Sequence, residues 1–297
     1  MSERARWELE PGDAIADGRS ALKRLGGGNR YEVYLAWDEH LFSLVVAKVL
    51  RPDQVDDSRA LRELGEEAEI LDALAHPVIV RGFDAVLDGP MPHLVIEHLE
   101  GPSLRRLIRR GGALGLQQLL PLALHVAGAL EYMSHEDTVH LDVKPDNIIM
   151  GVPPRLIDLS IARSLERAAT TSGPIGTDAY MPPEQCEGDS QGRIGTASDV
   201  WGLGATLHHA VTGEVPFPRE RSARDSDDPE IRFPQLVEPP RPLPDTAPPE
   251  LRELILATLD KDPAERPTPG ELAGRLEPLV AELPRKLALS RRAARFG

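Results

Sequence analysis

Cysteine, lysine and aromatic residues are scarce in this chain of 297 residues, and long apolar runs are missing. With a single cysteine, Cys186, the chain has no internal disulfide and no cysteine-rich zinc site, and it fits a reducing compartment. No apolar run approaches the about 18 residues of a membrane helix. Residues 1–13 hold four acidic side chains and no apolar run, which excludes a secretory signal. We therefore expect a cytoplasmic protein without a membrane span in these residues.

Basic residues are outnumbered by acidic ones, 34 against 48, so the formal charge is −14. An acidic chain is a poor candidate for coating nucleic acid, and we expect no nucleic-acid partner. Hydrophobic residues make up 41%, which suffices for a sizeable core and excludes a wholly disordered chain. Only five of the basic residues are lysine, and the other 29 are arginine. Because arginine does not replace a compact ammonium beside a phosphate, each lysine needs its own explanation.

The pattern of apolar residues divides the chain into a strand-rich first third and a helical remainder. Leu61, Leu64, Ala68 and Leu71 recur at helical spacing and predict a helix over residues 56–74. Short runs rich in Val, Tyr, Leu and Trp predict strands. The predicted strands are 21–25, 32–37, 44–50, 78–87 and 93–98, and the later helices begin at 117 and span 197–212, 249–259 and 269–283. We therefore expect an α+β protein with a small β-rich lobe and a larger α-helical lobe.

Two further segments carry local signals. Residues 229–249 hold eight prolines and predict an extended connector; a docking site for a proline-recognising domain is the alternative. Thr268-Pro-Gly-Glu271 is a capping-box sequence with proline at the first helical position, which predicts a helix that begins at Pro269.

A run of three glycines, Gly26–Gly28, lies between two predicted strands. Glycine lets backbone N–H groups approach phosphate oxygens, but a simple hairpin turn has the same sequence pattern. Lys48 lies in an apolar strand, where a lysine is costly unless it is paired, meets an anion or reaches water at a sheet edge. Glu67 on the predicted helix is a candidate partner, although Glu66 and Glu69 are equally close in sequence.

The segment from Val139 to Ile149, followed by Leu156-Ile157-Asp158-Leu159-Ser160, has the strongest chemical signal. Asp142, Lys144, Asn147 and Asp158 form a polar set flanked by apolar residues. Asn and Asp oxygens suit Mg²⁺, a carboxylate can accept a hydroxyl proton, and an ammonium can neutralise a phosphate.

With these residues in place, the chain resembles the eukaryotic-type (Hanks-type) serine/threonine protein kinases of bacteria over about residues 19–280. The motifs that carry the resemblance are Leu25-Gly26-x-Gly28 with Val33, Lys48, Glu67, the hinge-like 95–99, the catalytic loop, Asp158, 176–184, Ser198-Asp199 to Gly204, and Asp262-Pro263-x-x-Arg266-Pro267. The resemblance implies a bilobal kinase fold, with an N-lobe at 19–96, a hinge at 97–102 and a C-lobe at 103–280. Residues 1–18 would be an N-terminal extension and 281–297 a basic tail.

The resemblance also implies a role for each matching residue. Asp142 would orient the acceptor hydroxyl and take its proton, Lys144 would face the γ-phosphate, and Lys48, oriented by Glu67, would hold the other phosphates. Asn147 and Asp158 would hold Mg²⁺. The ATP-binding residues would be Leu25, Gly26, Gly27, Gly28, Asn29, Val33, Lys48, Glu97, Leu99 and Ile149. Glu184 and Arg266 would form a structural ion pair, and Asp199 would brace the catalytic loop.

The implied activity is transfer of the γ-phosphate of ATP to Ser or Thr of protein substrates, the chain itself included, for which a homodimer would serve. Thr170 and Thr171 are the candidate autophosphorylation sites; the alternative is that they are polar residues of a loop. Phosphorylation of a small molecule is a weaker option.

Four positions depart from the family pattern. Tyr31 replaces a glycine, Leu141 replaces the arginine beside Asp142, Ser160 replaces the glycine after Asp158-Leu159, and Pro182 replaces the alanine before Pro183-Glu184. Leu141 implies that activation-loop phosphorylation is not obligatory, because that arginine docks the phosphate. The first three departures motivate a second hypothesis, a pseudokinase-like module that binds nucleotide or a partner without transferring phosphate.

Overall fold

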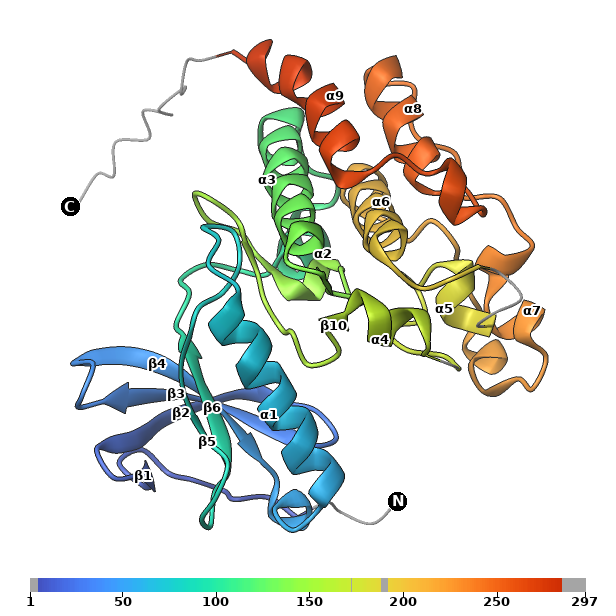
Figure 1. Ribbon diagram of the computed structural model, residues 1–297. Helices are drawn as coiled ribbons and strands as arrows, with labels where there is room; N and C mark the ends of the chain where they lie inside the picture. The colour runs from blue at the N-terminus through green and yellow to red at the C-terminus, as the bar shows by residue number, and fades with distance from the viewer. Residues whose placement is uncertain (1–4, 172, 188–191, 285–297) are drawn as a thin grey trace.

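The computed structural model describes residues 5–171, 173–187 and 192–284, so most of the basic tail expected at 281–297 lies outside the described residues. The chain folds into a small lobe of strands with one helix and a larger lobe of helices, as Figure 1 shows. This confirms the expected α+β arrangement of a small β-rich lobe and a larger α-helical lobe. No helix within the described ranges is long and apolar enough to cross a membrane.

The small lobe is an antiparallel sheet with strand order β1-β2-β3-β4-β6-β5. Residues of β3 alternate between buried and partly exposed positions, as a strand with one covered face requires. Helix α1 (Ser58–Ala73) packs against β5 and β6 and lies between the sheet and the larger lobe (Figure 1). The strands are β1 (Ala14–Ala16), β2 (Arg19–Gly27), β3 (Tyr31–Asp38), β4 (Ser43–Leu50), β5 (Gly82–Val86) and β6 (His93–Glu97).

The segment before β2 covers the sheet face that points away from the larger lobe. The Trp7 indole N–H donates to the Leu50 carbonyl at 2.6 Å, and the Trp7 backbone N–H donates to Glu32 at 2.9 Å. Trp7 and Leu9 pack against a cluster that contains Tyr34, Val45 and Val95. Residues 7–18 therefore complete the small lobe, and the domain boundary at residue 19 stays a prediction.

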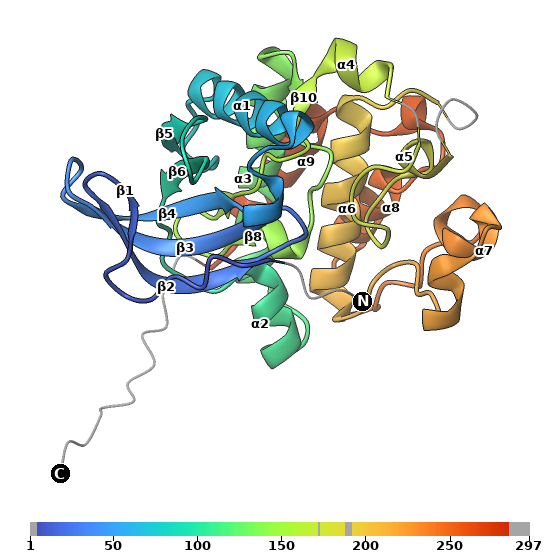
Figure 2. The same ribbon diagram turned by 90° about the horizontal axis from the view of Figure 1, so that it is seen from below.

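The larger lobe is built around α6 (Thr196–Thr212), in which every residue from Ser198 to Val211 is buried. Helix α3 (Leu116–His135) packs against α6 and α9, and α8 also contacts α6 (Figures 1 and 2). The other helices of this lobe are α2 (Leu104–Gly111), α4 (Leu165–Ala169), α5 (Pro183–Glu187), α7 (Pro229–Arg232), α8 (Pro249–Thr258) and α9 (Pro269–Ala281). Two short ribbons pair β7 (Thr138–Val139) with β10 (Arg163–Ser164) and β8 (Ile148–Ile149) with β9 (Arg155–Leu156).

Most predicted elements appear within a few residues of their expected ends, and the capping box is confirmed. Glu271 donates its backbone N–H to the Thr268 hydroxyl at 3.1 Å, and Thr268 donates its own to the Glu271 carboxylate at 2.8 Å. The connector at 229–249 was predicted wrongly in its first part. It begins with α7 and a 3-10 turn, Pro234–Leu236, whose Gln235 side chain donates to the carbonyls of Asp178 and Met181.

Two other expectations need correction. The strand expected over 78–87 is confined to β5, because the backbone of residues 78–80 bonds to the larger lobe instead. The Val80 N–H donates to the Leu156 carbonyl at 2.9 Å, and the Leu156 N–H donates to the Val78 carbonyl at 2.6 Å. Helix α2 was not predicted, since the glycines around it suggested an irregular segment. The Ser103 side chain caps this short helix. The contacts between residues 78–80 and Leu156 join the two lobes behind the cleft.

Candidate functional site

A cleft of about 720 Å³ opens between the two lobes. Its lining brings together nine of the residues expected at the site, from segments as far apart as β2 and β9. These are Leu25, Val33, Lys48, Glu67, Glu97, Leu99, Asn147, Ile149 and Asp158. Gly26, Gly27 and Gly28 do not line it; they lie in the hairpin of β2 and β3, and Asn29 lines a neighbouring hollow.

Lys48 lies on the cleft face of the sheet, since its register partners are Val33 on β3 and Leu94 on β6. Its ammonium donates to both Glu67 oxygens at 2.8 Å and to Asp158 Oδ1 at 3.1 Å. Burial opposes the charge on Lys48, but Asp158 and Glu67 outweigh burial and raise its pKa above the ordinary value. The ammonium is therefore held charged at neutral pH, and it also lies 4.7 Å from the centre of the Tyr31 ring.

The helix geometry selects Glu67 from the three candidate carboxylates. Glu66 pairs with Arg167 at 2.6 Å, and Glu69 lines a cavity on another side of α1. Successive helical residues point about 100° apart, so only one of these neighbours can face Lys48.

Asp158 follows β9 with a positive φ of 66°, a backbone conformation that costs a non-glycine residue of order 1–3 kcal/mol. Ser160 replaces a glycine of the family pattern, but it is not among the described residues with positive φ, so the position does not need glycine's conformational freedom in this structure. The charge of Lys48 lowers the pKa of Asp158 well below its ordinary value, against the effect of burial. The strained backbone thus points an ionised carboxylate at the cleft.

Asp142 lies at the centre of a hydrogen-bond network in the catalytic loop. Lys144 Nζ donates to Asp142 Oδ2 at 2.5 Å, and Asn147 Nδ2 donates to the same oxygen at 3.1 Å. The Thr177 hydroxyl accepts from Lys144 at 2.6 Å and donates to Asp142 Oδ1 at 2.8 Å. Both carboxylate oxygens are therefore oriented by neighbours. The sequence placed Thr177 only within the motif at 176–184, and no local signal indicated this contact.

Asp199 on α6 anchors the backbone of the catalytic loop. Its two carboxylate oxygens accept the backbone N–H groups of His140 and Leu141, each at 2.7 Å. These bonds hold Leu141 at a φ of 65°. The Leu141 side chain is buried in an apolar cluster with Val139, Ala168 and Ile194, so nonpolar packing supports the segment after Asp158 at this point.

The donors in the cleft suit magnesium and a nucleotide. Asn147 donates its amide nitrogen to Asp142, and no hydrogen bond among the described residues uses its amide oxygen. Mg²⁺ in phosphate sites takes one or two protein oxygens and completes its shell with water and phosphate, so Asn147 and Asp158 fit it. Apolar walls that include Val46, Val80 and Ile96 suit a flat base, and within the described chain Leu99 makes no backbone hydrogen bond.

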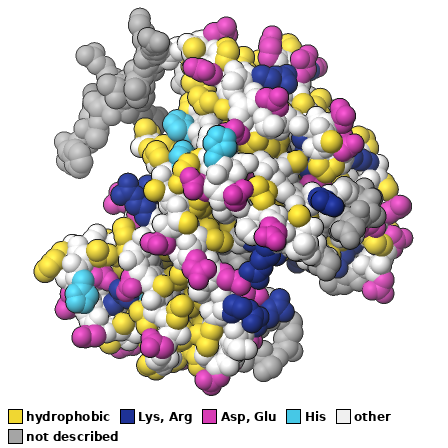
Figure 3. All heavy atoms as spheres, in the orientation of Figure 1, with side chains coloured by type: hydrophobic (Ala, Val, Ile, Leu, Met, Phe, Trp, Pro, Cys, Tyr) yellow, Lys and Arg dark blue, Asp and Glu magenta, His cyan; other side chains and the backbone are white. Residues whose placement is uncertain are grey.

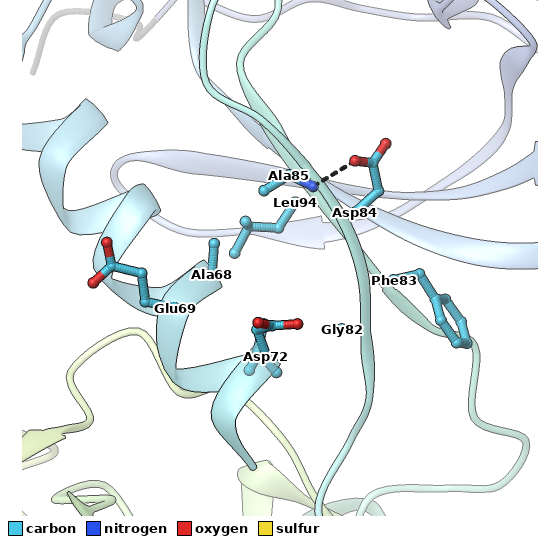
Figure 4. Close-up of a pocket in the computed structure, with 9 residues that line it drawn as sticks. Ala68, Glu69, Asp72, Gly82, Phe83, Asp84, Ala85 and Leu94 are labelled. Atoms are coloured by element: carbon cyan, nitrogen blue, oxygen red, sulfur yellow. Dashed lines mark hydrogen bonds between the residues drawn. The ribbon is translucent and has the colours of Figure 1, made fainter. Parts of the chain in front are cut away.

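Close backbone approach explains two glycines. A Cβ on Gly27, whose φ is 153°, would lie 2.5 Å from the Tyr31 carbonyl oxygen, so the β2–β3 hairpin can close tightly. A Cβ on Gly82 would lie 2.9 Å from Leu71 Cβ, so Gly82 lets β5 approach α1. Figure 4 shows the cavity of about 300 Å³ beside this contact, with Ala68 and Asp72 of α1 facing β5. The close packing positions the helix that carries Glu67.

A second hollow, of about 930 Å³, lies between the start of α1, the β2–β3 hairpin and α4. Arginines gather on this face in Figure 3, and most of them have partners: Arg30 and Arg59 pair with Glu63, and Arg167 pairs with Glu66. Thr171 lines the hollow and accepts from Arg163 at 2.9 Å, while Thr170 is exposed nearby. The role of either threonine as an autophosphorylation site stays a prediction.

A cluster that was not predicted lies under α2. The Tyr180 hydroxyl accepts from Arg105 at 3.2 Å and lies 2.7 Å from His209 Nδ1. Burial, and then the nearby Arg105, lowers the pKa of His209 to about 4. The four arginines within residues 105–110 are the sequence signal that could have drawn attention to this cluster.

The His209 pKa predicts a loss of stability in mild acid. The unfolded chain takes up a proton on this residue near pH 6.5, whereas the folded chain does so only near pH 4. The free energy of unfolding should therefore fall as pH drops from 7 to 5, by about 2 kcal/mol from this residue. Urea unfolding across this range should show a smaller fall in His209→Gln than in the unsubstituted chain. Equal slopes in the two proteins would contradict the assignment.

Comparison with known proteins agrees with this geometry. A family model described as the protein kinase domain matches residues 19–275. The chain is 35% identical over 272 residues to a probable serine/threonine-protein kinase PkwA of Thermomonospora curvata, covering 90% of this chain and 35% of that protein. It is 35% identical over 202 residues to serine/threonine-protein kinase PknB of Mycobacterium leprae, covering 65% and 32% respectively. For PknB of Mycolicibacterium smegmatis the identity is 32% over 257 residues, covering 82% and 39%.

The chain therefore spans between 32% and 39% of the length of these relatives. The family match nevertheless runs through both lobes and through every segment that lines the cleft. The chain belongs to the protein kinase domain family, and within it to the eukaryotic (Hanks) type of bacterial serine/threonine protein kinase.

Proposed function

We propose that this chain uses ATP and Mg²⁺ to phosphorylate Ser and Thr hydroxyls of protein substrates, itself included. One observation carries the proposal: Asn147 lines the cleft together with Lys48, Glu67 and Asp158, and it donates to Asp142, so the Asp142 network adjoins the cleft that holds the triad. Phosphoryl transfer needs positioned cations and a hydroxyl acceptor site more than it needs covalent help from the protein. Both are present here as preorganised side chains.

In this proposal Asp142 accepts a hydrogen bond from the substrate hydroxyl and takes its proton as the oxygen attacks the γ-phosphorus. The bond between that phosphorus and the bridging oxygen breaks, and ADP leaves with the electron pair. Lys144, 2.5 Å from Asp142, is placed to face the transferred group, and Lys48 to face the remaining phosphates. Mg²⁺ held by Asn147 and Asp158 would neutralise phosphate charge. Leu25, Val33 and Ile149 would enclose the base, and Glu97 and Leu99 would bond to its edge through their backbones.

The glycine hairpin completes the proposed nucleotide site. Gly26, Gly27 and Gly28 precede a tight turn, and Gly28 donates its backbone N–H to Tyr31 at 3.0 Å. We expect this hairpin and Asn29 to lie over the phosphates. Tyr31, at the position of a glycine in the family, lies beside Lys48 and lines the neighbouring hollow.

The test is transfer of labelled phosphate from ATP to peptides that differ only in a Ser, Thr, Tyr or Ala acceptor. We expect label on the Ser and Thr peptides, loss of label when EDTA removes Mg²⁺, and loss in Lys48→Met. Nucleotide binding without any transfer would overturn the proposal and favour the pseudokinase-like alternative.

A further inference from the structure

Helix α2 concentrates positive charge in an acidic protein. It carries Arg105, Arg106, Arg109 and Arg110 and no acidic residue. Arg109 and Arg110 lie in the last turn, where cations stabilise a helix. Arg105 and Arg106 lie in the first turn, where the helix dipole disfavours a cation. Helix stability therefore does not account for the first pair.

These arginines also lack counter-ions. Among the described residues, no carboxylate lies within ion-pair distance of any of the four, whereas three of the five arginines that line the other basic hollow, Arg30, Arg59 and Arg167, are paired. In a chain with a net charge of −14, a group of unpaired cations is not a consequence of composition. The charge on α2 is therefore available to an external anion.

Arg105 is the member of this group that faces the interior. Its Nη1 donates to the Tyr180 hydroxyl at 3.2 Å and lies 3.4 Å from both ring nitrogens of His209. His209 is neutral at pH 7, and burial raises the pKa of Tyr180 above its ordinary value, so both neighbours are uncharged. Asp146 contributes to the raised pKa of Tyr180, but this carboxylate is exposed and forms no ion pair with Arg105 in the described structure. A half-buried guanidinium thus meets only neutral partners.

The cluster lies beside the proposed acceptor site. Tyr180 donates its backbone N–H to the Thr177 carbonyl at 2.8 Å, and the Thr177 hydroxyl donates to Asp142 at 2.8 Å. Met150, shortly after the catalytic loop, donates its backbone N–H to the Pro102 carbonyl at 2.9 Å. This bond joins the chain just before α2 to the segment that follows the loop. Figure 2 shows α2 next to the end of α6. Arg105 is therefore linked to Asp142 through two intervening residues, Tyr180 and Thr177.

We propose that Arg105, with Arg106 beside it, forms a cationic subsite that selects protein substrates with Asp or Glu within a few residues of the acceptor hydroxyl. The inference rests on the proposed kinase function and names its substrate class. A guanidinium can bind a carboxylate through two parallel hydrogen bonds. The remaining arginines of α2 would attract acidic segments that the net charge of the protein otherwise repels.

The kinetic test uses short synthetic peptides with one Thr acceptor, in which Glu, Ala or Lys is placed at each nearby position in turn. At the best position we expect kcat/KM to be at least about tenfold higher for Glu than for Lys, mainly through KM. Arg105→Glu should reverse the preference and Arg105→Lys should retain part of it. Arg106→Glu, whose side chain makes no hydrogen bond in the described structure, should weaken the preference without affecting the fold.

The matched control is Arg275→Glu, which makes the same charge change at an exposed position of α9. We expect it to leave the preference unchanged. Equal effects of Arg275→Glu and Arg105→Glu would overturn the subsite, because they would show a response to net charge alone. A wild-type preference for Lys peptides would overturn it as well.

A binding measurement separates this inference from the proposed function. Fluorescently labelled Glu and Lys peptides, with Ala in place of the acceptor, are titrated with the wild-type chain and with Arg105→Glu. Tighter binding of the Glu peptide that depends on Arg105, without phosphate transfer to the Thr peptides, would support the subsite and refute the kinase function. Transfer with no charge preference in binding or kinetics would refute the subsite alone.

Discussion

Asp142→Asn is expected to lower phosphate transfer to a Thr peptide by a factor on the order of 10²–10⁴, the usual contribution of a positioned general base. An amide cannot take the hydroxyl proton, although it fills nearly the same volume. The Asp142 oxygens are already oriented by Thr177 at 2.8 Å and Lys144 at 2.5 Å, so the loss should appear mainly in kcat. Steady-state kinetics at saturating ATP provide the measurement.

Asp146→Asn is the control, because it changes an exposed carboxylate in the same loop. We expect it to transfer phosphate at close to the wild-type rate. Both variants should bind nucleotide and unfold at similar urea concentrations, which separates a chemical loss from a folding defect. Undiminished transfer by Asp142→Asn would remove Asp142 from its role.

Arg266→Met is expected to destabilise the fold by about 3–5 kcal/mol, because it leaves a buried carboxylate without its counter-ion. Arg266 donates to Glu184 at 2.7 and 3.0 Å, and both side chains are 0% exposed. The guanidinium also donates to the carbonyls of Ala197 and Asp260 and lies 4.9 Å from the centre of the Trp201 ring. Urea unfolding should show the loss, and Tm should fall by about 10 °C.

The contrast is Arg252→Met, which removes an ion pair whose acid, Asp245, is 98% exposed. Exposed pairs contribute at most about 1 kcal/mol, so this variant should remain close to wild type. Adding Glu184→Gln to Arg266→Met should recover part of the stability, since it removes the stranded charge. A loss from Arg266→Met no larger than that from Arg252→Met would mean that the ion pair does not support the larger lobe.

Features that depend on neighbours in the chain were predicted well. Runs rich in Val, Tyr, Leu and Trp identified β3 and β4, because such side chains favour strands, and 3–4 spacing identified α1, because burial of one helix face imposes that period. The capping box was readable from Thr268 and Glu271 for the same local reason. The order and spacing of the kinase motifs indicated which residues converge on the cleft, and the structure places nine of them in its lining.

Features that depend on distant contacts were predicted poorly. The proline-rich segment contains α7 and a buried turn because Gln235 satisfies the carbonyls of Asp178 and Met181, more than 50 residues earlier. Residues 78–80 bond to Leu156 of the larger lobe instead of extending β5. No local pattern carries such pairings, since each depends on where another segment lies.

The sequence by itself determined the two lobes, the cleft residues and the choice of lysine at positions 48 and 144, because motif spacing and periodicity are written along the chain. Only the tertiary structure decided that residues 78–80 bond to Leu156, that Thr177 holds Asp142, and that Arg105 meets neutral partners. The contacts of Arg105 with Tyr180 and His209 join residues 75 and 104 positions apart. Whether a charge is compensated depends on what folding brings near it, and that neighbourhood exists only after the chain has packed.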